Sequence, residues 1–209
     1  MIKKKFSTSS KIWMERNRKD LYVINSRRFK FRSRSWFKLD EIQKMDNILC
    51  CGMTVVDLGS SPGGWSQYSS NKVSNKGRVI AFDILPMHPI KNVYFINGDF
   101  FDRSCVKKLL EKIGNNKVQA VISDMLPNIS GVNEIDIPKI MLMSNLVLDF
   151  CCSILIRNGN LILKTFQNKE CKNFLEKVKS KFSFVKIRKP NASRKESKEI
   201  YVVAKKKYN

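Results

Sequence analysis

The stretch that most constrains this chain is residues 54–65, Thr-Val-Val-Asp-Leu-Gly-Ser-Ser-Pro-Gly-Gly-Trp, in which a short β-branched run stops at an aspartate and enters a turn. Residues 65–72 can then begin a helix, so the pattern predicts a strand, a tight loop and a helix N-terminus. Glycines there permit positive φ and a close approach to bare backbone, and the helix start presents unpaired N–H groups. The loop therefore predicts a binding site of nucleotide size.

The glycine spacing in this loop argues against two phosphate-binding motifs. A P-loop requires a lysine and a hydroxyl residue directly after its last glycine, whereas Gly64 is followed by Trp65. A dinucleotide fingerprint requires Gly-x-Gly-x-x-Gly, and this loop lacks the second glycine. The pattern fits a ligand without phosphates, such as S-adenosyl-L-methionine bound at an Asp-x-Gly loop after the first strand of a Rossmann-like sheet. The alternative is a glycine-rich turn that binds nothing.

Alternating strand and helix signals continue to the C-terminus. Residues 35–49 predict a helix whose apolar stripe leaves out Lys38. The expected strands cover 54–58, 78–83, 93–97, 118–123, 160–165, 184–188 and 200–204, and the other helices 65–72, 102–113, 138–155 and 169–182. This order predicts an α/β fold with a mostly parallel sheet covered on both faces. The last two strands, with no helix between them, are expected to form an antiparallel pair.

The charge of the chain points to a polyanionic partner. Lysine and arginine number 40 against 18 acidic residues, a net charge of +22 in 209 residues. This excess favours nucleic acid over a membrane surface, because no basic amphipathic helix with an aromatic face is evident. Residues 1–34 are the most basic segment and interleave aromatic residues with the charges, which favours single-stranded RNA binding over a solvating tail. We expect an RNA-binding arm over 1–34, ordered mainly on RNA, and one domain over 35–209.

The cysteines and the single histidine predict neither a metal site nor disulfides. The six cysteines show no Cys-x-x-Cys spacing, and His88 is alone in a proline-rich turn. The N-terminus lacks the apolar core of a signal peptide, and the longest apolar run, around 147–156, is interrupted by Asp149 and too short to span a bilayer. These features predict a cytoplasmic protein.

Five polar residues follow the predicted strands in order: Asp57, Asp83, Asp99, Asp124 and Lys164. The carboxyl ends of parallel strands meet at one edge of the sheet, where ligands of such folds bind. Each residue alone could be a cap or a surface charge. Five at one edge predict a functional site.

The motifs along the chain closely resemble the FtsJ/RrmJ family of ribosomal RNA 2′-O-methyltransferases. The resemblance runs in order from about residue 33 to 204. The matching motifs are Asp57 to Tyr68, Asp83 to Met87, Gly98 to Phe100, Ser123 to Gly131, Leu163 to Gln167, and Arg188 to Pro190 with Ser193, Arg194 and Glu199. It implies the fold of class I methyltransferases dependent on S-adenosyl-L-methionine: a mostly parallel seven-stranded sheet with an antiparallel C-terminal strand.

The resemblance also implies a set of site residues. The catalytic tetrad of the family falls here on Lys38, Asp124, Lys164 and Glu199. By the same resemblance the cofactor would be contacted by Gly63, Trp65, Asp83, Asp99 and Asp124. Two departures are mild: Ser60 and Ser61 stand where small residues such as alanine are common. Leu126 replaces a small residue and is the departure that could crowd the methionine pocket.

The tetrad suits methyl transfer to a ribose hydroxyl, because the enzyme must align hydroxyl and sulfonium and accept a proton. The hypothesis is that Lys164 takes the proton, that Asp124 and Glu199 orient it, and that Lys38 positions the ribose. Its rival keeps Lys164 charged as a donor to the developing alkoxide.

The resemblance implies methylation of a uridine of 23S ribosomal RNA, with the assembled 50S subunit as the expected substrate. We expect a monomer, although the sequence leaves the oligomeric state open. Transfer RNA is the alternative substrate, since relatives act on anticodon loops. A non-catalytic ribosome-assembly factor would explain the charge but not the tetrad. An NAD-dependent oxidoreductase would explain Asp83, but the glycine spacing argues against it.

Overall fold

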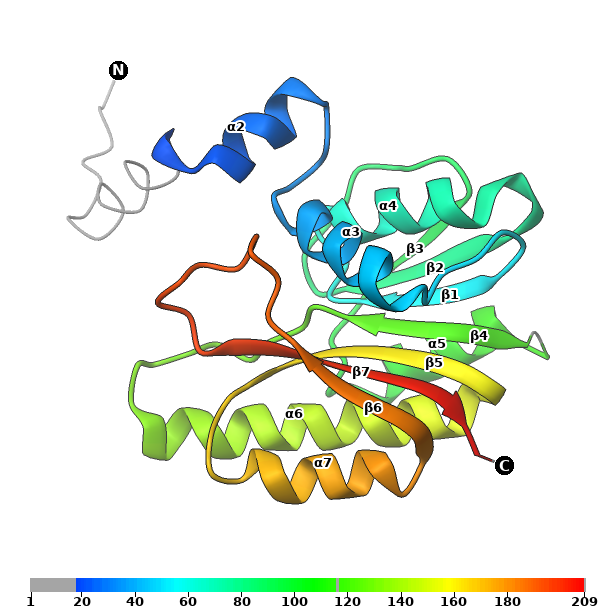
Figure 1. The fold of residues 1–209 in the computed structure, drawn as a ribbon. Coiled ribbons are helices and arrows are strands. Elements are labelled where there is room, and N and C mark those ends of the chain that lie inside the picture. Colours follow the sequence, from blue (N-terminus) through cyan, green and yellow to red (C-terminus); the bar gives the residue numbers. More distant parts are fainter. Residues whose placement is uncertain (1–17, 116, 209) are drawn as a thin grey trace.

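The computed structural model describes residues 18–115 and 117–208, which form a seven-stranded sheet with helices on both faces (Figure 1). The strands follow the order β3-β2-β1-β4-β5-β7-β6. Their bounds are β1 Thr54–Leu58, β2 Arg78–Asp83, β3 Val93–Asn97, β4 Val118–Ser123, β5 Leu155–Phe166, β6 Phe182–Arg188 and β7 Glu199–Lys207.

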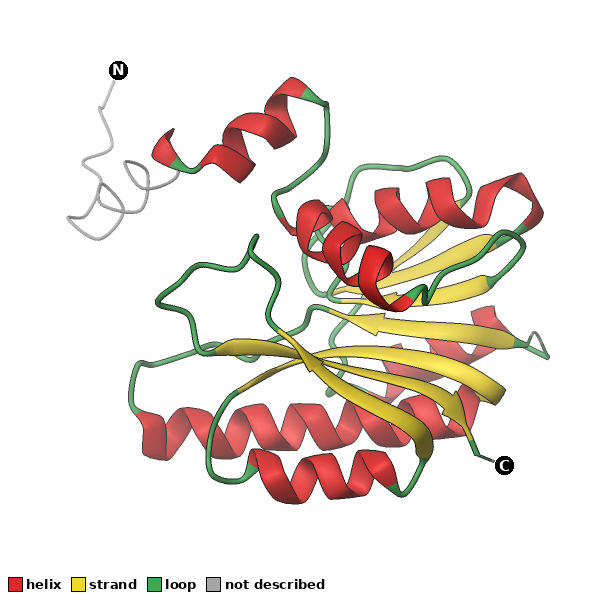
Figure 2. Cartoon of the chain, in the orientation of Figure 1, coloured by secondary structure: helices red, strands yellow, loops and turns green. Residues whose placement is uncertain are grey.

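The direction of the strands confirms the predicted sheet. Strands β1 to β5 pair in parallel, and β7 runs antiparallel between β5 and β6. The carboxyl ends of β1, β2, β4 and β5 therefore meet the amino end of β7 at one edge (Figure 2). Every functional residue that the sequence predicts on a strand end is brought to this edge.

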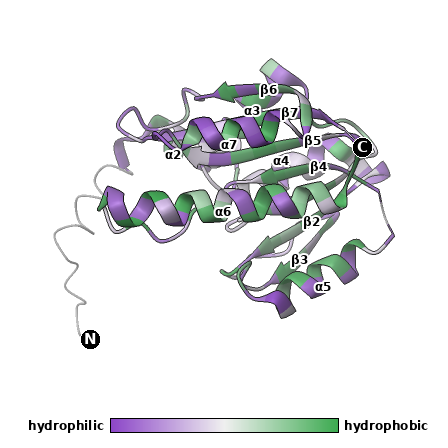
Figure 3. Ribbon diagram, turned by 90° about the horizontal axis from the view of Figure 1, so that it is seen from below, coloured by the Kyte–Doolittle hydropathy of each residue, from purple (hydrophilic) through white to green (hydrophobic). Residues whose placement is uncertain are grey.

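Two separate apolar layers hold the helices on the sheet. The described helices are α2 Leu21–Arg28, α3 Ser35–Asp46, α4 Gly64–Val73, α5 Arg103–Ile113, α6 Asn133–Ile154, α7 Cys171–Lys179 and the 3-10 turn Ser74–Lys76. Leu39 and Ile42 of α3 and Tyr68 of α4 pack on one face, and residues of α5, α6 and α7 pack on the other. The strands are largely apolar, whereas α6 and α7 carry hydrophilic residues on part of their surface (Figure 3).

The boundaries around α6 differ from the prediction. The helix begins at Asn133, five residues before Pro138, and its first turn carries Glu134 and Asp136, which suit the positive end of the helix dipole. The chain then enters β5 directly at Leu155 instead of after a loop. Length and composition alone would allow α6 to cross a membrane, but apolar residues along its length belong to the core against the sheet.

The predicted bounds of β1 to β4 match the structure, whereas several other ends were wrong by a few residues. Helix α3 ends at Asp46, not at residue 49, because Asn47 takes a left-handed conformation with φ 47°. Helix α7 is shorter at both ends than the predicted 169–182, and β6 and β7 are longer than predicted. Apolar periodicity marks a segment better than its ends, which depend on local caps.

The described part of the basic segment, residues 18–34, makes contacts with itself and with α3. Asp20 caps α2, and its carboxylate also pairs with Arg34 at 2.8 Å. The ring of Phe31 stacks on Trp36 of α3 with 3.8 Å between centroids. Some of the interleaved aromatic residues thus pack on α3, and ordering of the arm on RNA stays a prediction. Residues 1–17, with most of the predicted arm's lysines, lie outside the described residues.

Candidate active site

The glycine loop between β1 and α4 is held against the end of β2. The backbone N–H groups of Gly59 and Ser60 both donate to the carbonyl of Phe82, at 2.9 and 3.2 Å. Gly59 and Gly63 have φ values of 75° and 109°, which disfavour any residue with a Cβ. A Cβ on Gly59 would lie 2.6 Å from Cγ of Met125. Met125, and not the neighbouring Leu126, is thus the side chain packed on this glycine.

Two buried polar atoms beside this loop have no hydrogen-bond partner among the described residues. They are Oδ1 of Asp57 and Oγ of Ser60, which belong to residues 0% and 3% exposed. A bare glycine backbone with an unpaired carboxylate oxygen fits the cationic methionine end of S-adenosyl-L-methionine. Asp57 ends a predicted strand but was not among the predicted cofactor contacts.

The carboxyl group of Asp57 is hard to ionise in this setting. Burial raises its pKa to about 7, the hydrogen bond from Ser66 at 2.6 Å opposes the rise, and the charges of Asp124 and Asp83 add to it. A cationic ligand at this loop would favour the ionised form.

The predicted cofactor residues beyond the loop differ in their setting. Asp83 accepts backbone N–H groups from Ser61 at 2.7 Å and Leu85 at 2.8 Å, which fixes its carboxylate at the end of β2. Asp99 is exposed at the same edge, beyond the end of β3. The side chain of Trp65 is in the core, where Nε1 donates to the carbonyl of Ser35 at 2.9 Å, so a cofactor contact at this position would come from its backbone.

The four tetrad residues come together as two lysine–carboxylate pairs. Nζ of Lys164 lies 2.9 Å from Oδ1 of Asp124 and also donates to the backbone carbonyl of Asp124. Nζ of Lys38 lies 2.6 Å from Oε1 of Glu199. All four side chains are nearly buried, between 10% and 18% exposed. Glu199 was expected to orient Lys164, but the structure pairs it with Lys38. Lys38 is also buried, although it falls outside the apolar stripe of α3.

A residue absent from the sequence prediction joins the two pairs. The hydroxyl of Tyr201 donates to Oδ1 of Asp124 at 2.9 Å and accepts from Nζ of Lys38 at 3.2 Å. Residues paired across two antiparallel strands share a face, and Lys164 is paired with Tyr201. The alternation Glu199, Tyr201, Val203 in β7 is the sequence signal that places this hydroxyl beside Glu199.

The network holds Asp124 ionised and Tyr201 protonated. Burial alone would raise the pKa of Asp124, but the charges of Lys164 and Lys38 and the hydrogen bonds from Lys164 and Tyr201 lower it below its ordinary value. Burial and the carboxylates of Asp124 and Glu199 raise the pKa of the Tyr201 hydroxyl well above its ordinary value. The site therefore contains a stable anion next to Lys164 at neutral pH.

A cavity of about 390 Å³ opens beside Lys38 and Glu199. Its rim carries two arginines, Arg34 and Arg194, together with Glu196 and Ser197. Helix α3 is fixed against the loop before β7 by Glu41, whose carboxylate accepts the N–H groups of Asn191 and Ala192. The two arginines and the lysine that line this cavity suit a phosphodiester. Within 18–115 and 117–208, no three His, Cys, Asp or Glu residues are grouped closely enough to hold a metal ion.

The fold and the edge site define a class of protein, the Rossmann-like methyltransferases. Residues 31–207 match the FtsJ-like methyltransferase family, and the chain belongs to that family.

Solved structures agree with this assignment. A protein from Plasmodium falciparum described as a ribosomal RNA methyltransferase is 27% identical, with a TM-score of 0.77 over 85% of this chain and 98% of its own. A Clostridium thermocellum protein described as an rRNA methylase is 20% identical, with a TM-score of 0.54 over 81% of this chain and 95% of its own. The second likeness, at its low identity, concerns the fold alone.

Proposed function

We propose that this methyltransferase transfers a methyl group from S-adenosyl-L-methionine to the ribose 2′-hydroxyl of a uridine in large-subunit ribosomal RNA. The observation that carries the proposal is the joined pair of ion pairs, Lys164 with Asp124 and Lys38 with Glu199, directly beside the glycine loop. The likeness to a relative described as acting on ribosomal RNA supports the substrate class. We also propose a cytoplasmic monomer that acts on the assembled subunit.

The cofactor, when bound, supplies a methyl group already activated by its positive sulfur. Lys164, in its neutral form, would accept the proton of the ribose 2′-hydroxyl as that oxygen takes the methyl group in place of the sulfur. Asp124 holds Nζ of Lys164 in place through its carboxylate and its backbone carbonyl. Lys38, held by Glu199 and Tyr201, positions the ribose.

The alternative mechanism keeps Lys164 charged throughout, as a donor to the developing alkoxide. This alternative has a structural basis in the contact of Nζ of Lys164 with the Asp124 carboxylate at 2.9 Å. A pH–rate profile separates the two mechanisms. A basic limb that disappears in the Lys164→Met variant supports proton acceptance, and a profile with no such limb supports the charged donor.

The test of the function is transfer of labelled methyl from S-adenosyl-L-methionine to purified large ribosomal subunits, free ribosomal RNA and total transfer RNA in parallel. Lys164→Ala is the negative control. Label at one uridine that resists alkaline cleavage at that nucleotide supports the proposal. Label confined to transfer RNA would retain the enzyme and change its substrate. Cofactor binding without transfer to any RNA would favour the assembly-factor reading.

A further inference from the structure

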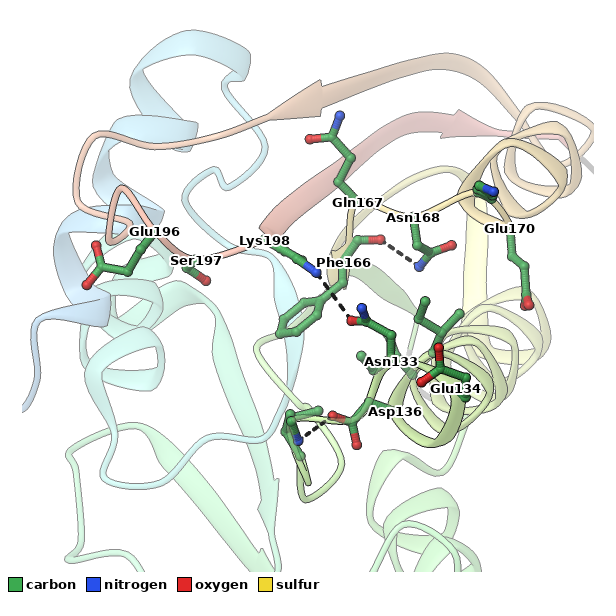
Figure 4. Close-up of a pocket in the computed structure, with 15 residues that line it drawn as sticks. Asn133, Glu134, Asp136, Phe166, Gln167, Asn168, Glu170, Glu196, Ser197 and Lys198 are labelled. Carbon is green, nitrogen blue, oxygen red and sulfur yellow. Dashed lines mark hydrogen bonds between the residues drawn. The ribbon is translucent and has the colours of Figure 1, made fainter. Parts of the chain in front are cut away.

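A second cavity lies next to the tetrad and has no part in the mechanism above. It measures about 730 Å³, within the range of small-molecule sites, and opens between the end of β5, the start of α6 and the loop before β7 (Figure 4). It shares Glu196 and Ser197 with the cavity beside Lys38, so the two cavities adjoin around one loop. We call it the Phe166 cavity after the aromatic residue on its wall.

Phe166 is placed by the same strand register that builds the tetrad. It follows Lys164 by two residues in β5 and pairs with Glu199 in β7, so Phe166, Lys164, Glu199 and Tyr201 share one face of the sheet. Two residues along a strand span roughly 7 Å, which is about one nucleotide of extended RNA. Figure 4 shows the ring among the residues that line the cavity, near Lys198 and Asn133.

The charges around the Phe166 cavity oppose those of the rest of the protein. Four carboxylates, those of Glu134, Asp136, Glu170 and Glu196, line it beside Lys169 and Lys198, in a chain of net charge +22. Like charges repel, so the cavity disfavours a phosphate and accepts an uncharged planar group that can donate hydrogen bonds.

Part of the polar wall of the Phe166 cavity is hydrogen-bonded within the protein. Nζ of Lys198 donates to Oδ1 of Asn133 at 3.2 Å, an exposed contact that leaves the Nδ2 group of the amide as a donor. Asp136 accepts the backbone N–H groups of Ser130 and Gly131 at 2.8 Å each, which anchors the loop on the other side. An aromatic ring beside a held amide is suited to a nucleobase that stacks on one and bonds to the other.

We infer that the Phe166 cavity binds an unstacked nucleobase, either that of the methylated nucleotide or that of its immediate neighbour. The inference rests on the proposed function, because the ribose at Lys164 fixes which base can reach Phe166. Phe166 contacts the π-face of the base, and polar groups of the cavity bond to its hydrogen-bonding edge. The RNA backbone follows the neighbouring cavity lined by Arg34 and Arg194. RNA that keeps all its bases stacked in a duplex would not fit.

The test is a double-mutant cycle between Phe166 and the RNA. The RNA is the shortest one that the wild-type enzyme methylates, made intact or with a single base removed at the target position or at either neighbour. Binding is measured by fluorescence anisotropy and turnover by methyl transfer. Phe166→Leu keeps apolar volume without a π-face, and Phe166→Tyr keeps the ring. Phe101→Leu is the control, since Phe101 is 50% exposed and lies beyond β3, away from the cavity.

We expect Phe166→Leu to weaken RNA binding by about 5-fold to 150-fold, the usual effect of losing one stacked base, with cofactor affinity unchanged. Phe166→Tyr and Phe101→Leu should bind like the wild type. One abasic RNA should weaken wild-type binding by the same factor and have no further effect on Phe166→Leu; its position identifies the base.

Two results would separate this inference from the proposed function. In the first, the wild type methylates the intact RNA, but the factors by which Phe166→Leu and each abasic site weaken RNA binding multiply in combination. The inferred base site is then wrong and the proposed function stands. If the wild type methylates no RNA, the proposed function itself fails and the inference falls with it.

Discussion

Asp57 and Asp124 are carboxylates at the ends of neighbouring strands, and the fold shifts their pKa values in opposite directions. Asp57 closes the cofactor half of the site and Asp124 the half that holds the tetrad, with the backbone N–H of Asp124 donating to the carbonyl of Leu58 at 3.0 Å. Burial raises the pKa of Asp57 to about 7, whereas the lysines beside Asp124 lower its pKa despite burial. The partners of a carboxylate, more than its depth, decide its charge.

The two carboxylates also contribute to stability in opposite directions. Asp57 binds its proton more tightly in the folded protein, so its contribution is present below its ordinary pKa of 3.8 and is lost as pH rises to about 7. Asp124 contributes above its ordinary pKa, and that contribution is lost as pH falls through its lowered folded value. The half with Asp57 is thus suited to receiving a cation. The half with Asp124 is suited to keeping its carboxylate ionised.

The largest expected effect is on methyl transfer and comes from removing Lys164, the cation that pairs with Asp124. Lys164→Met should lower methyl transfer by about 10³-fold or more, because the proton acceptor or donor is lost and Asp124 is left unpaired. Cofactor affinity, measured by calorimetry, should change little. Lys179→Met is the matched control, since Lys179 also pairs with a carboxylate, Glu176, but on an exposed helix. Equal loss in both variants would contradict the role of Lys164.

The next effect concerns Asp57. Asp57→Asn removes a group whose pKa rises from 3.8 to about 7 on folding. At 1.36 kcal/mol per pH unit, this difference changes the free energy of unfolding by roughly 4 kcal/mol across the pH range between the two values. Denaturant unfolding of the cofactor-free protein at several pH values should show the variant gaining stability relative to the wild type from pH 4 to pH 8. Parallel stability curves for the two proteins would show that Asp57 titrates normally.

A smaller effect is expected where the two halves of the tetrad are joined. Tyr201→Phe removes a hydroxyl that bonds to Asp124 and Lys38 and should lower turnover by about 10-fold, the value of one good hydrogen bond. Tyr68→Phe is the control, because Tyr68 is equally buried and bonds to Asp40. A loss in both variants would indicate general destabilisation of the α3 and α4 layer.

The parts of the site differ in how far local sequence patterns determine them. The glycine loop and the strand ends could be predicted because each is encoded locally, as a β-branched run with a turn or as an aspartate after it. The contacts of Tyr201 and Phe166 are not encoded locally in this way, because they depend on the register of β5 against β7, which pairs residues 37 and 33 positions apart in the chain. The alternation in β7 places Tyr201 on the face of Glu199 but does not show that it meets Asp124 and Lys38. Likewise, the burial of Lys38 depends on Glu199, 161 residues away. Local patterns identify the ends of strands, and only the assembled sheet shows which side chains meet there.

The smallest expected effect sharpens the contrast between Asp57 and Asp124. Ser66→Ala removes the one hydrogen bond that lowers the pKa of Asp57, so that pKa should rise further, by less than about one pH unit. In the Ser66→Ala background, the free energies of unfolding with and without Asp57→Asn are compared across pH. The pH midpoint of their difference should lie higher than in the wild-type background by the same amount. Ser69→Ala is the control, because Ser69 lies buried in the same helix and its hydroxyl has no partner among the described residues. A downward shift would mean that Ser66 stabilises the neutral carboxyl, and the unpaired oxygen of Asp57 would then no longer be prepared for a cation.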